Sequence, residues 1–219
     1  MTRTLFAPVP TPLVPIVGQE TYYPISRIFC VGRNYAAHAV EMGNPVDRSA
    51  PFYFTKSPAS VVLSGAEIPY PAKTDDLHHE MELAVYLGED GVLGYGCALD
   101  LTRRDLQAVA KEKARPWSVA KDFENSAVLG HITAASQISE LTDRPIRLAV
   151  NGQLRQDASL ADMIHSVPAI LEDLATYYHL QAGDVILTGT PAGVGPLRRG
   201  DRAIGTIEGL EPVEIRIQS

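Results

Sequence analysis

The sequence predicts an α+β fold that is rich in β-strands, and three observations support this class. Short apolar runs bounded by Gly, Pro, Asn and Asp recur along the 219 residues, as expected for strands joined by turns. Only about three segments have the apolar spacing of a helix. Strands and helices do not alternate as they do in a doubly wound sheet. We therefore expect a mixed, largely antiparallel architecture.

The composition, with 45% hydrophobic and 21% charged residues, is that of an ordinary globular protein. We expect an extended, Pro-rich arm over residues 1–24 and a single domain over residues 25–219. No apolar run is long enough to cross a bilayer, and the prolines from Pro8 to Pro15 argue against a signal peptide. We therefore expect a cytoplasmic protein that does not associate with membranes.

The charge argues against a nucleic-acid-binding protein, and the cysteines argue against a redox or thiolate metal site. The net charge of −7, without a basic stripe, argues against nucleic acid as a partner. Cys30 and Cys97 lie in apolar runs, where a small buried thiol is the simplest interpretation, so neither is given a redox or metal role. If the substrate is an anion, the positive charge that attracts it must be local.

The predicted elements follow from local patterns. Strands are expected at 25–32, 51–56, 61–70, 76–87, 94–99, 147–150, 153–156, 185–188 and twice within 201–219. Helices are expected at 35–42, from about 102 to 113, and from 166 to 178, with extended chain at 117–120. Asn34 is the expected N-cap of the first helix and Gly43 its C-terminal residue. Asn151-Gly152 is the strongest hairpin signal.

Two acidic residues stand two positions apart in what looks like a buried strand. Glu80 and Glu82 would share one face of this strand, and the apolar run Leu83–Leu87 follows them. Two carboxylates held close together need a cation or a shared proton. A structural ion-pair set with neighbouring arginines explains the spacing equally well.

Asp100 favours a ligand site over a structural ion-pair set, because it ends an apolar strand directly before a helix. Three carboxylates without a thiol cluster suit Mg²⁺ or Mn²⁺ better than Zn²⁺. His78 and His79 are outside any His-Glu-x-x-His pattern. We interpret them as flanking residues, one of which could donate a hydrogen bond to a carboxylate.

His38 and Glu41 stand at i and i+3 on the first predicted helix. They could form a surface pair worth only a few tenths of a kcal/mol. Alternatively, Glu41 orients the imidazole, and His38 acts as a general base near neutral pH. The short helix could also move as a lid.

Candidate substrate contacts follow Asp100. Helical spacing puts Arg104 and Gln107 on one face, and Lys121 follows an apolar run that would cover its stem. Each also has a plain interpretation as a solvated surface residue. The loop 189–195 lacks the Lys-Ser/Thr of a P-loop, but a Thr in such a turn could offer its hydroxyl and N–H groups to a carboxylate.

These motifs, taken in order, resemble the fumarylacetoacetate hydrolase family from residue 25 onward. The segments that carry the resemblance are 30–38, 78–82, 99–107, 116–121, 150–152 and 187–195. The resemblance implies a mixed β-sandwich roll of the C-terminal domain type, which makes residues 25–219 the catalytic domain. It also implies a homodimer. One departure is the abrupt segment 87–94, because family members generally have a longer segment there.

The resemblance also assigns roles. It implies Mg²⁺ or Mn²⁺ held by Glu80, Glu82 and Asp100. It implies catalytic roles for His38, Glu41 and Lys121, with substrate contacts from Arg33, Arg104, Gln107 and Thr190. The expected substrate is an anionic keto acid of low molecular weight, and the acyl end of its pocket is expected around residues 44–48.

The expected activity is therefore metal-dependent hydrolysis of the C–C bond of acylpyruvates, with fumarylpyruvate from gentisate breakdown first. The alternatives are oxaloacetate decarboxylation, or isomerisation or hydration of a related keto acid, because the fold alone does not choose between them. A non-catalytic binder of metal or carboxylate is the remaining alternative. A poised His38–Glu41 base argues against it.

Overall fold

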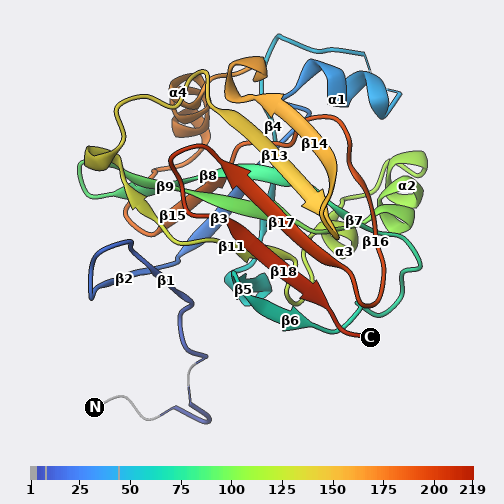
Figure 1. The fold of residues 1–219 in the computed structure, drawn as a ribbon. Coiled ribbons are helices and arrows are strands. Elements are labelled where there is room, and N and C mark those ends of the chain that lie inside the picture. The colour runs from blue at the N-terminus through green and yellow to red at the C-terminus, as the bar shows by residue number, and fades with distance from the viewer. Residues whose placement is uncertain (1–3, 8, 44) are drawn as a thin grey trace.

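The computed structural model describes residues 4–7, 9–43 and 45–219, and β-strands dominate it (Figure 1). The largest sheet has eight strands in the order β4-β3-β15-β8-β9-β11-β5, with β12 paired to β9. Its strands are β3 (Arg27–Gly32), β4 (Phe52–Lys56), β5 (Val61–Leu63), β8 (Met81–Gly88), β9 (Gly91–Asp100), β11 (Ala127–Leu129), β12 (Thr133–Ala134) and β15 (Asp184–Leu187). The pairs β15/β3 and β11/β5 are parallel, and the other pairs of this sheet are antiparallel.

A second sheet of five strands, in the order β14-β13-β17-β18-β6, packs in front of the first in Figure 1. Its strands are β6 (Ala66–Ile68), β13 (Pro145–Val150), β14 (Gln153–Ser159), β17 (Arg202–Ile207) and β18 (Val213–Ile217). Two small sheets are formed by β10 (Thr102–Arg103), β7 (Leu77–His79) and β16 (Gly195–Leu197), and by β1 (Leu13–Pro15) and β2 (Tyr22–Pro24).

The helices lie around the sheets rather than between them (Figure 1). They are α1 (Ala36–Glu41), α2 (Arg104–Glu112), α3 (Ser118–Lys121) and α4 (Val167–Tyr177), with 3-10 turns at Pro58–Ser60, Ala135–Gln137 and Leu160–Asp162. The predicted class, a β-rich α+β fold with mixed sheets, is confirmed. None of the helices in the described part of the chain has the length and hydropathy needed to cross a lipid bilayer.

The core lies on both faces of the large sheet, because side chains alternate along each strand. Leu83 and Val85 on β8 face the second sheet and belong to the larger apolar cluster. Ala84 and Tyr86 face the other way, where Val14 from the N-terminal segment covers them. The predicted arm over residues 1–24 therefore contributes buried side chains, although residues 1–3 and 8 lie outside the described chain.

Local signals predicted some elements correctly. The Asn151-Gly152 hairpin is confirmed: both residues have positive φ, 51° and 77°, and join β13 to β14. Gly43 has φ of 70° after α1, as predicted for the helix end. β8 and β9 pair up to Gly88 and Gly91, with one register shift between Tyr86 and Leu87, so the short segment noted above is a tight turn.

Three local predictions were wrong because tertiary contacts decided otherwise. The N-cap of α1 is Tyr35, while the Asn34 amide bonds to the backbone of His165 and Thr188. The chain at 117–120, predicted to be extended, forms α3 with the N-cap Trp117. The helix predicted from about residue 102 begins at Arg104, after the strand β10.

Candidate active site

Three carboxylates meet where β7, β8 and β9 run together. Glu80 is the single residue between β7 and β8, Glu82 lies on β8, and Asp100 is the last residue of β9. The backbone N–H of Asp100 donates to the carbonyl of Glu80 at 2.9 Å. One ligand oxygen from each residue lies within 4.8 Å of the others, and all three residues are buried. The structure therefore brings together the three carboxylates that the sequence analysis singled out.

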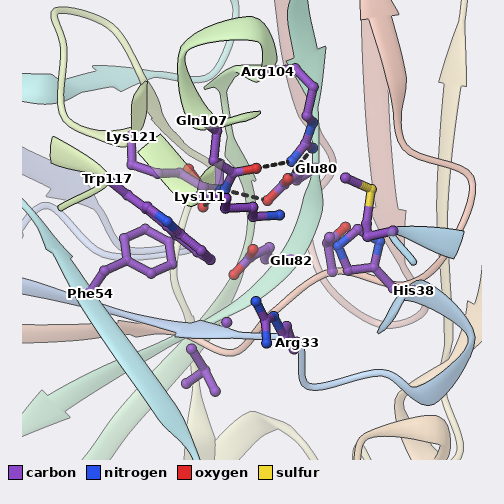
Figure 2. Close-up of a pocket in the computed structure, with 15 residues that line it drawn as sticks. Arg33, His38, Phe54, Glu80, Glu82, Arg104, Gln107, Lys111, Trp117 and Lys121 are labelled. Carbon is purple, nitrogen blue, oxygen red and sulfur yellow. Dashed lines mark hydrogen bonds and ion pairs between the residues drawn. The ribbon is translucent and has the colours of Figure 1, made fainter. Parts of the chain in front are cut away.

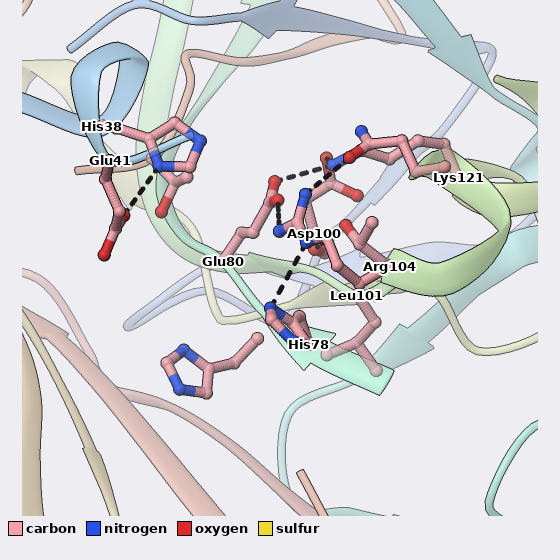
Figure 3. A network of polar contacts seen from close by, with 12 residues as sticks. His38, Glu41, His78, Glu80, Asp100, Leu101, Arg104 and Lys121 are labelled. Atoms are coloured by element: carbon pink, nitrogen blue, oxygen red, sulfur yellow. Dashed lines mark hydrogen bonds and ion pairs between the residues drawn. The ribbon is translucent and has the colours of Figure 1, made fainter. Parts of the chain in front are cut away.

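Cations neutralise part of this acidic cluster (Figure 3). Lys121 Nζ lies 2.7 Å from Glu80 Oε2 and 2.7 Å from Asp100 Oδ2. The Arg104 guanidinium contacts the other oxygen of Glu80. Lys56 Nζ lies 2.8 Å from Asp100 Oδ1, and this oxygen lacks a partner with hydrogen-bond geometry. The cluster is a buried network rather than a surface ion pair.

Lys56 is a site residue that the sequence reasoning missed. It ends β4, and its Nζ also donates to Ser126 Oγ at 2.9 Å and to the Lys121 carbonyl. A signal was available, since Phe54 and Lys56 stand two apart in a predicted strand and so share a face. Phe54 is partly buried, and a lysine that is buried on the same face needs an acidic partner.

The pKa values of Glu80 and Glu82 are shifted in opposite directions. Burial alone would raise the pKa of Glu80, but the nearby Lys121 and Arg104 charges outweigh burial and lower it. Burial raises the pKa of Glu82 well above its usual range, and the charges of Asp100 and Glu80 raise it further. Burial would lower the pKa of Lys121, but Asp100 and Glu80 raise it overall. Lys121 is therefore held as a cation.

The donor set fits a divalent cation. Within the described residues, Glu82 has no ion-pair partner and accepts only the Gly189 N–H, at 2.8 Å. An oxygen of Asp100 likewise has an unsatisfied hydrogen-bonding position. Three buried carboxylate oxygens are the ligands that Mg²⁺ and Mn²⁺ prefer. A bound cation would supply the positive charge that Glu82 lacks.

Gly189 needs to be glycine at this position. Its φ is +96°, and a Cβ there would lie 2.8 Å from the Cβ of Asn34. L-residues with a side chain rarely adopt this conformation, and the contact with Asn34 leaves no room for one. The N–H group that orients Glu82 therefore depends on both the turn and its neighbour.

His38 faces the same cavity from α1. Its Nδ1 lies 3.2 Å from Glu41 Oε2, and Glu41 Oε1 accepts the Gly193 N–H at 3.0 Å. Burial lowers the pKa of His38 below its usual value, although Glu80 and Glu41 oppose this effect. The ring is therefore neutral near pH 7. With Nδ1–H donating to the Glu41 carboxylate, Nε2 is the atom that can accept a proton.

The predicted substrate contacts line this cavity, which has a volume of about 30 Å³. Arg33, His38, Arg104, Gln107, Lys121 and Thr190 are among its walls, with Glu80, Glu82 and Asp100. Arg104 donates to Gln107 Oε1 at 2.6 Å, so the two α2 residues act as one polar unit. Figure 2 shows Arg33, His38, Arg104, Gln107 and Lys121 arranged around Glu80 and Glu82.

Two further buried residues lie beside the site. The sequence analysis missed Gln156 and described His79 only as a flanking residue. Gln156 on β14 is fully buried, donates to Thr190 Oγ1 at 2.8 Å, and accepts the Met81 N–H at 3.0 Å. His79 Nδ1 lies 3.2 Å from the same amide oxygen, and burial lowers the pKa of His79 to about 4. His78 lies within hydrogen-bond distance of Arg104 Nε, at 3.3 Å. Nothing in the sequence near Gln156 marks it, because its partners are distant in the chain.

A β-roll with buried carboxylates facing a neutral histidine is the architecture of an enzyme of the fumarylacetoacetate hydrolase class. The chain belongs to this family: residues 27–218 match the family model for the fumarylacetoacetate (FAA) hydrolase C-terminal domain. The family and the fold type inferred from the sequence are thereby confirmed.

Relatives of known name support this membership. The chain is 43% identical over 189 residues to a fumarylpyruvate hydrolase of Ralstonia sp, covering 80% of this chain and 98% of the relative. It is 40% identical over 199 residues to an oxaloacetate tautomerase of Escherichia coli (strain K12), covering 85% and 90%. A crystal structure of fumarylpyruvate hydrolase from Pseudomonas aeruginosa in complex with Mn²⁺ and pyruvate has a TM-score of 0.95 at 38% identity, covering 99% of each chain.

Proposed function

We propose that this enzyme hydrolyses the C–C bond of acylpyruvates, with fumarylpyruvate as the foremost substrate and fumarate and pyruvate as products. The observation that carries the proposal is the neutral His38, held by Glu41, in the same cavity as the three carboxylates. The similarity to fumarylpyruvate hydrolases supports this choice of substrate.

We assign the ligands of a divalent cation, Mg²⁺ or Mn²⁺, to Glu80, Glu82 and Asp100. When bound, such an ion polarises a keto oxygen and stabilises negative charge that develops on it. Arg104 with Gln107, Thr190 and Arg33 are assigned to binding and orienting the anionic substrate. Their positions on the cavity wall and the short Arg104–Gln107 hydrogen bond support this assignment.

His38 then acts as the general base. Its Nε2 takes a proton from a water molecule, and the resulting hydroxide adds to the acyl carbonyl carbon. The bond between this carbon and C3 of the pyruvyl group breaks, and the electron pair goes to the leaving pyruvate enolate. Lys121 places positive charge beside the enolate, and C3 takes up the proton that His38 Nε2 had accepted, which gives pyruvate and returns the imidazole to its neutral form. Water is consumed and one carboxylic acid is formed, so the atoms balance.

The experiment measures pyruvate release from fumarylpyruvate, acetylpyruvate and oxaloacetate, with Mg²⁺ or Mn²⁺, with a chelator, and for His38→Ala. We expect metal-dependent release from the acylpyruvates and its loss in the variant. A rate that a chelator leaves unchanged would contradict the metal assignment. Turnover of oxaloacetate alone would replace the hydrolase assignment.

Oxaloacetate chemistry is the second candidate, and the 40% identity to an oxaloacetate tautomerase favours testing it. Keto–enol exchange of oxaloacetate needs a base at the same position but consumes no water. Following the decay of the enol absorbance, alongside pyruvate release, separates exchange from decarboxylation. An enzyme that equilibrates oxaloacetate but leaves acylpyruvates intact would be a tautomerase. A protein that binds Mn²⁺ but turns over none of these compounds would be a binder.

We further propose that the protein works as a cytoplasmic homodimer. The family resemblance supports the homodimer, and light scattering coupled to gel filtration measures this oligomeric state. A mass close to the 23.7 kDa of one chain would contradict the homodimer. The cytoplasmic location rests on the N-terminal sequence pattern alone.

A further inference from the structure

A second, larger cavity opens beside the site. Its volume is about 680 Å³, and it shares the walls Arg33, Phe54, Lys111, Trp117 and Lys121 with the inner cavity. The inner cavity, at about 30 Å³, holds only about two water molecules. An acylpyruvate bound through its pyruvyl end therefore extends its acyl group into the outer cavity. The described residues 45–48, where this end was expected, line neither cavity.

Two cations on the shared walls have no acidic partner. Lys121, Arg104 and Lys56 are all paired with carboxylates. In contrast, neither Arg33 nor Lys111 forms an ion pair with any described residue. Burial lowers the pKa of Lys111 to about 8, with further lowering by Arg104 and Arg33. The charge of Glu80 opposes this lowering. Because Lys111 and Arg33 form no ion pair of their own, they add positive potential where the two cavities join.

The remaining wall is aromatic. The rings of Phe54 and Trp117 lie 5.8 Å apart, and Lys111 Nζ lies 5.2 Å from the Trp117 ring centre. Figure 2 shows Phe54 and Trp117 side by side, with Lys111 reaching into the cavity and Arg33 on the far side of Glu82. A flat apolar wall with a cation beside it suits a planar, conjugated chain that ends in a carboxylate.

We propose that Lys111, together with Arg33, binds the distal carboxylate of dicarboxylic acylpyruvates in the outer cavity and thereby selects them over acyl groups that end in methyl. This inference rests on the proposed hydrolase function and adds its substrate class. The chain between the two carboxylates lies against Phe54 and Trp117. The pyruvyl carboxylate stays with the inner residues, so the two charged ends of the substrate meet different cations.

The test compares fumarylpyruvate with crotonylpyruvate, which has a methyl group in place of the distal carboxylate. We expect Lys111→Met to lower kcat/KM for fumarylpyruvate by about tenfold to hundredfold, mainly through KM, because a charged hydrogen bond is lost from binding. The value for crotonylpyruvate should change by less than about twofold, because no such bond forms with a methyl group. Lys111→Arg should restore most of the preference.

Lys113→Met is the matched control. Lys113 is exposed, lies two residues away at the end of α2, and lines neither cavity, so its loss changes net charge equally. The inference is overturned if Lys111→Met affects both substrates equally or neither, if Lys113→Met has the same effect, or if the wild type does not prefer fumarylpyruvate. Wild-type protein that cleaves neither compound refutes the proposed function itself, which is a different result.

Discussion

The two halves of the site are built in different ways. The carboxylate half stands on and directly before the central strands: Glu80 immediately precedes β8, Glu82 lies on β8 and Asp100 ends β9, and they are 4%, 2% and 0% exposed. The histidine half stands on α1, a helix of six residues in which the side chain of Glu41 is 34% exposed. The carboxylate half is part of the core, whereas the histidine half reaches the surface through Glu41, with His38 buried beside it.

We infer from this difference that the carboxylate half contributes to stability as well as to activity, whereas the histidine half contributes mainly to activity. Lys56, Lys121 and Arg104 are buried against the carboxylates, so changing an acid there leaves a buried cation without its partner. His38 and Glu41 contact each other and the loop at Gly193, and few other groups depend on them. Substitutions in the two halves should therefore differ in how strongly they lower the unfolding free energy and the activity.

The largest effect is expected for Asp100→Asn. It removes a proposed ligand and leaves Lys56 and Lys121 facing a neutral amide, so activity should fall by about a thousandfold or more. The metal-free protein should lose about 3–5 kcal/mol of unfolding free energy. Urea unfolding measures the second effect, with the exposed Asp143→Asn as control. Unaltered stability would show that the cations are not held by Asp100.

His38→Ala should lower activity strongly while it lowers the unfolding free energy only a little. Loss of the base lowers kcat by about 10²–10⁴-fold, whereas the unfolding free energy should fall by only about 1 kcal/mol, because few groups depend on the ring. Steady-state kinetics and urea unfolding of the same preparation make the comparison. His179→Ala, an exposed histidine on another element, should change neither. A large stability loss would make His38 part of the structural core.

Glu82→Gln tests the carboxylate half without breaking an ion pair. Burial and the charges of Asp100 and Glu80 already raise the pKa of Glu82, so a neutral side chain should leave the metal-free melting temperature unchanged or higher. The stabilisation by metal, about 2.7 kcal/mol at a hundredfold excess over Kd, should be lost. Thermal unfolding with and without Mn²⁺ measures both, and the exposed Glu67→Gln is the control. An unchanged metal-induced shift would remove Glu82 from the ligand set.

The same contrast explains what the sequence could predict. Glu80 and Glu82 were singled out by strand spacing, Asp100 by its position at the end of an apolar strand, and Asn151-Gly152 by turn chemistry, because these signals are local. The partners of Asn34 are 131 and 154 residues away, so its true role was hidden and a local N-cap was predicted instead. Lys56 was missed for the same reason, since Asp100 and Lys121 reach it only through the sheet. The fold class and the meeting of the three carboxylates could thus be predicted from the sequence, whereas the contacts that hold them in place could not.

The smallest effect is expected for Glu41→Gln, in the surface half. Burial lowers the pKa of His38, and Glu41 partly offsets this through its hydrogen bond and charge. Removing the charge should therefore lower this pKa further, and the acid limb of kcat/KM should move to lower pH. The rate on the plateau should fall by about tenfold or less, because a less basic imidazole is a weaker base. A pH profile for wild type, Glu41→Gln and the exposed control Glu211→Gln measures the shift. A limb that moves to higher pH would mean that Glu41 does not stabilise protonated His38, and the pair would lose its assignment as a catalytic dyad.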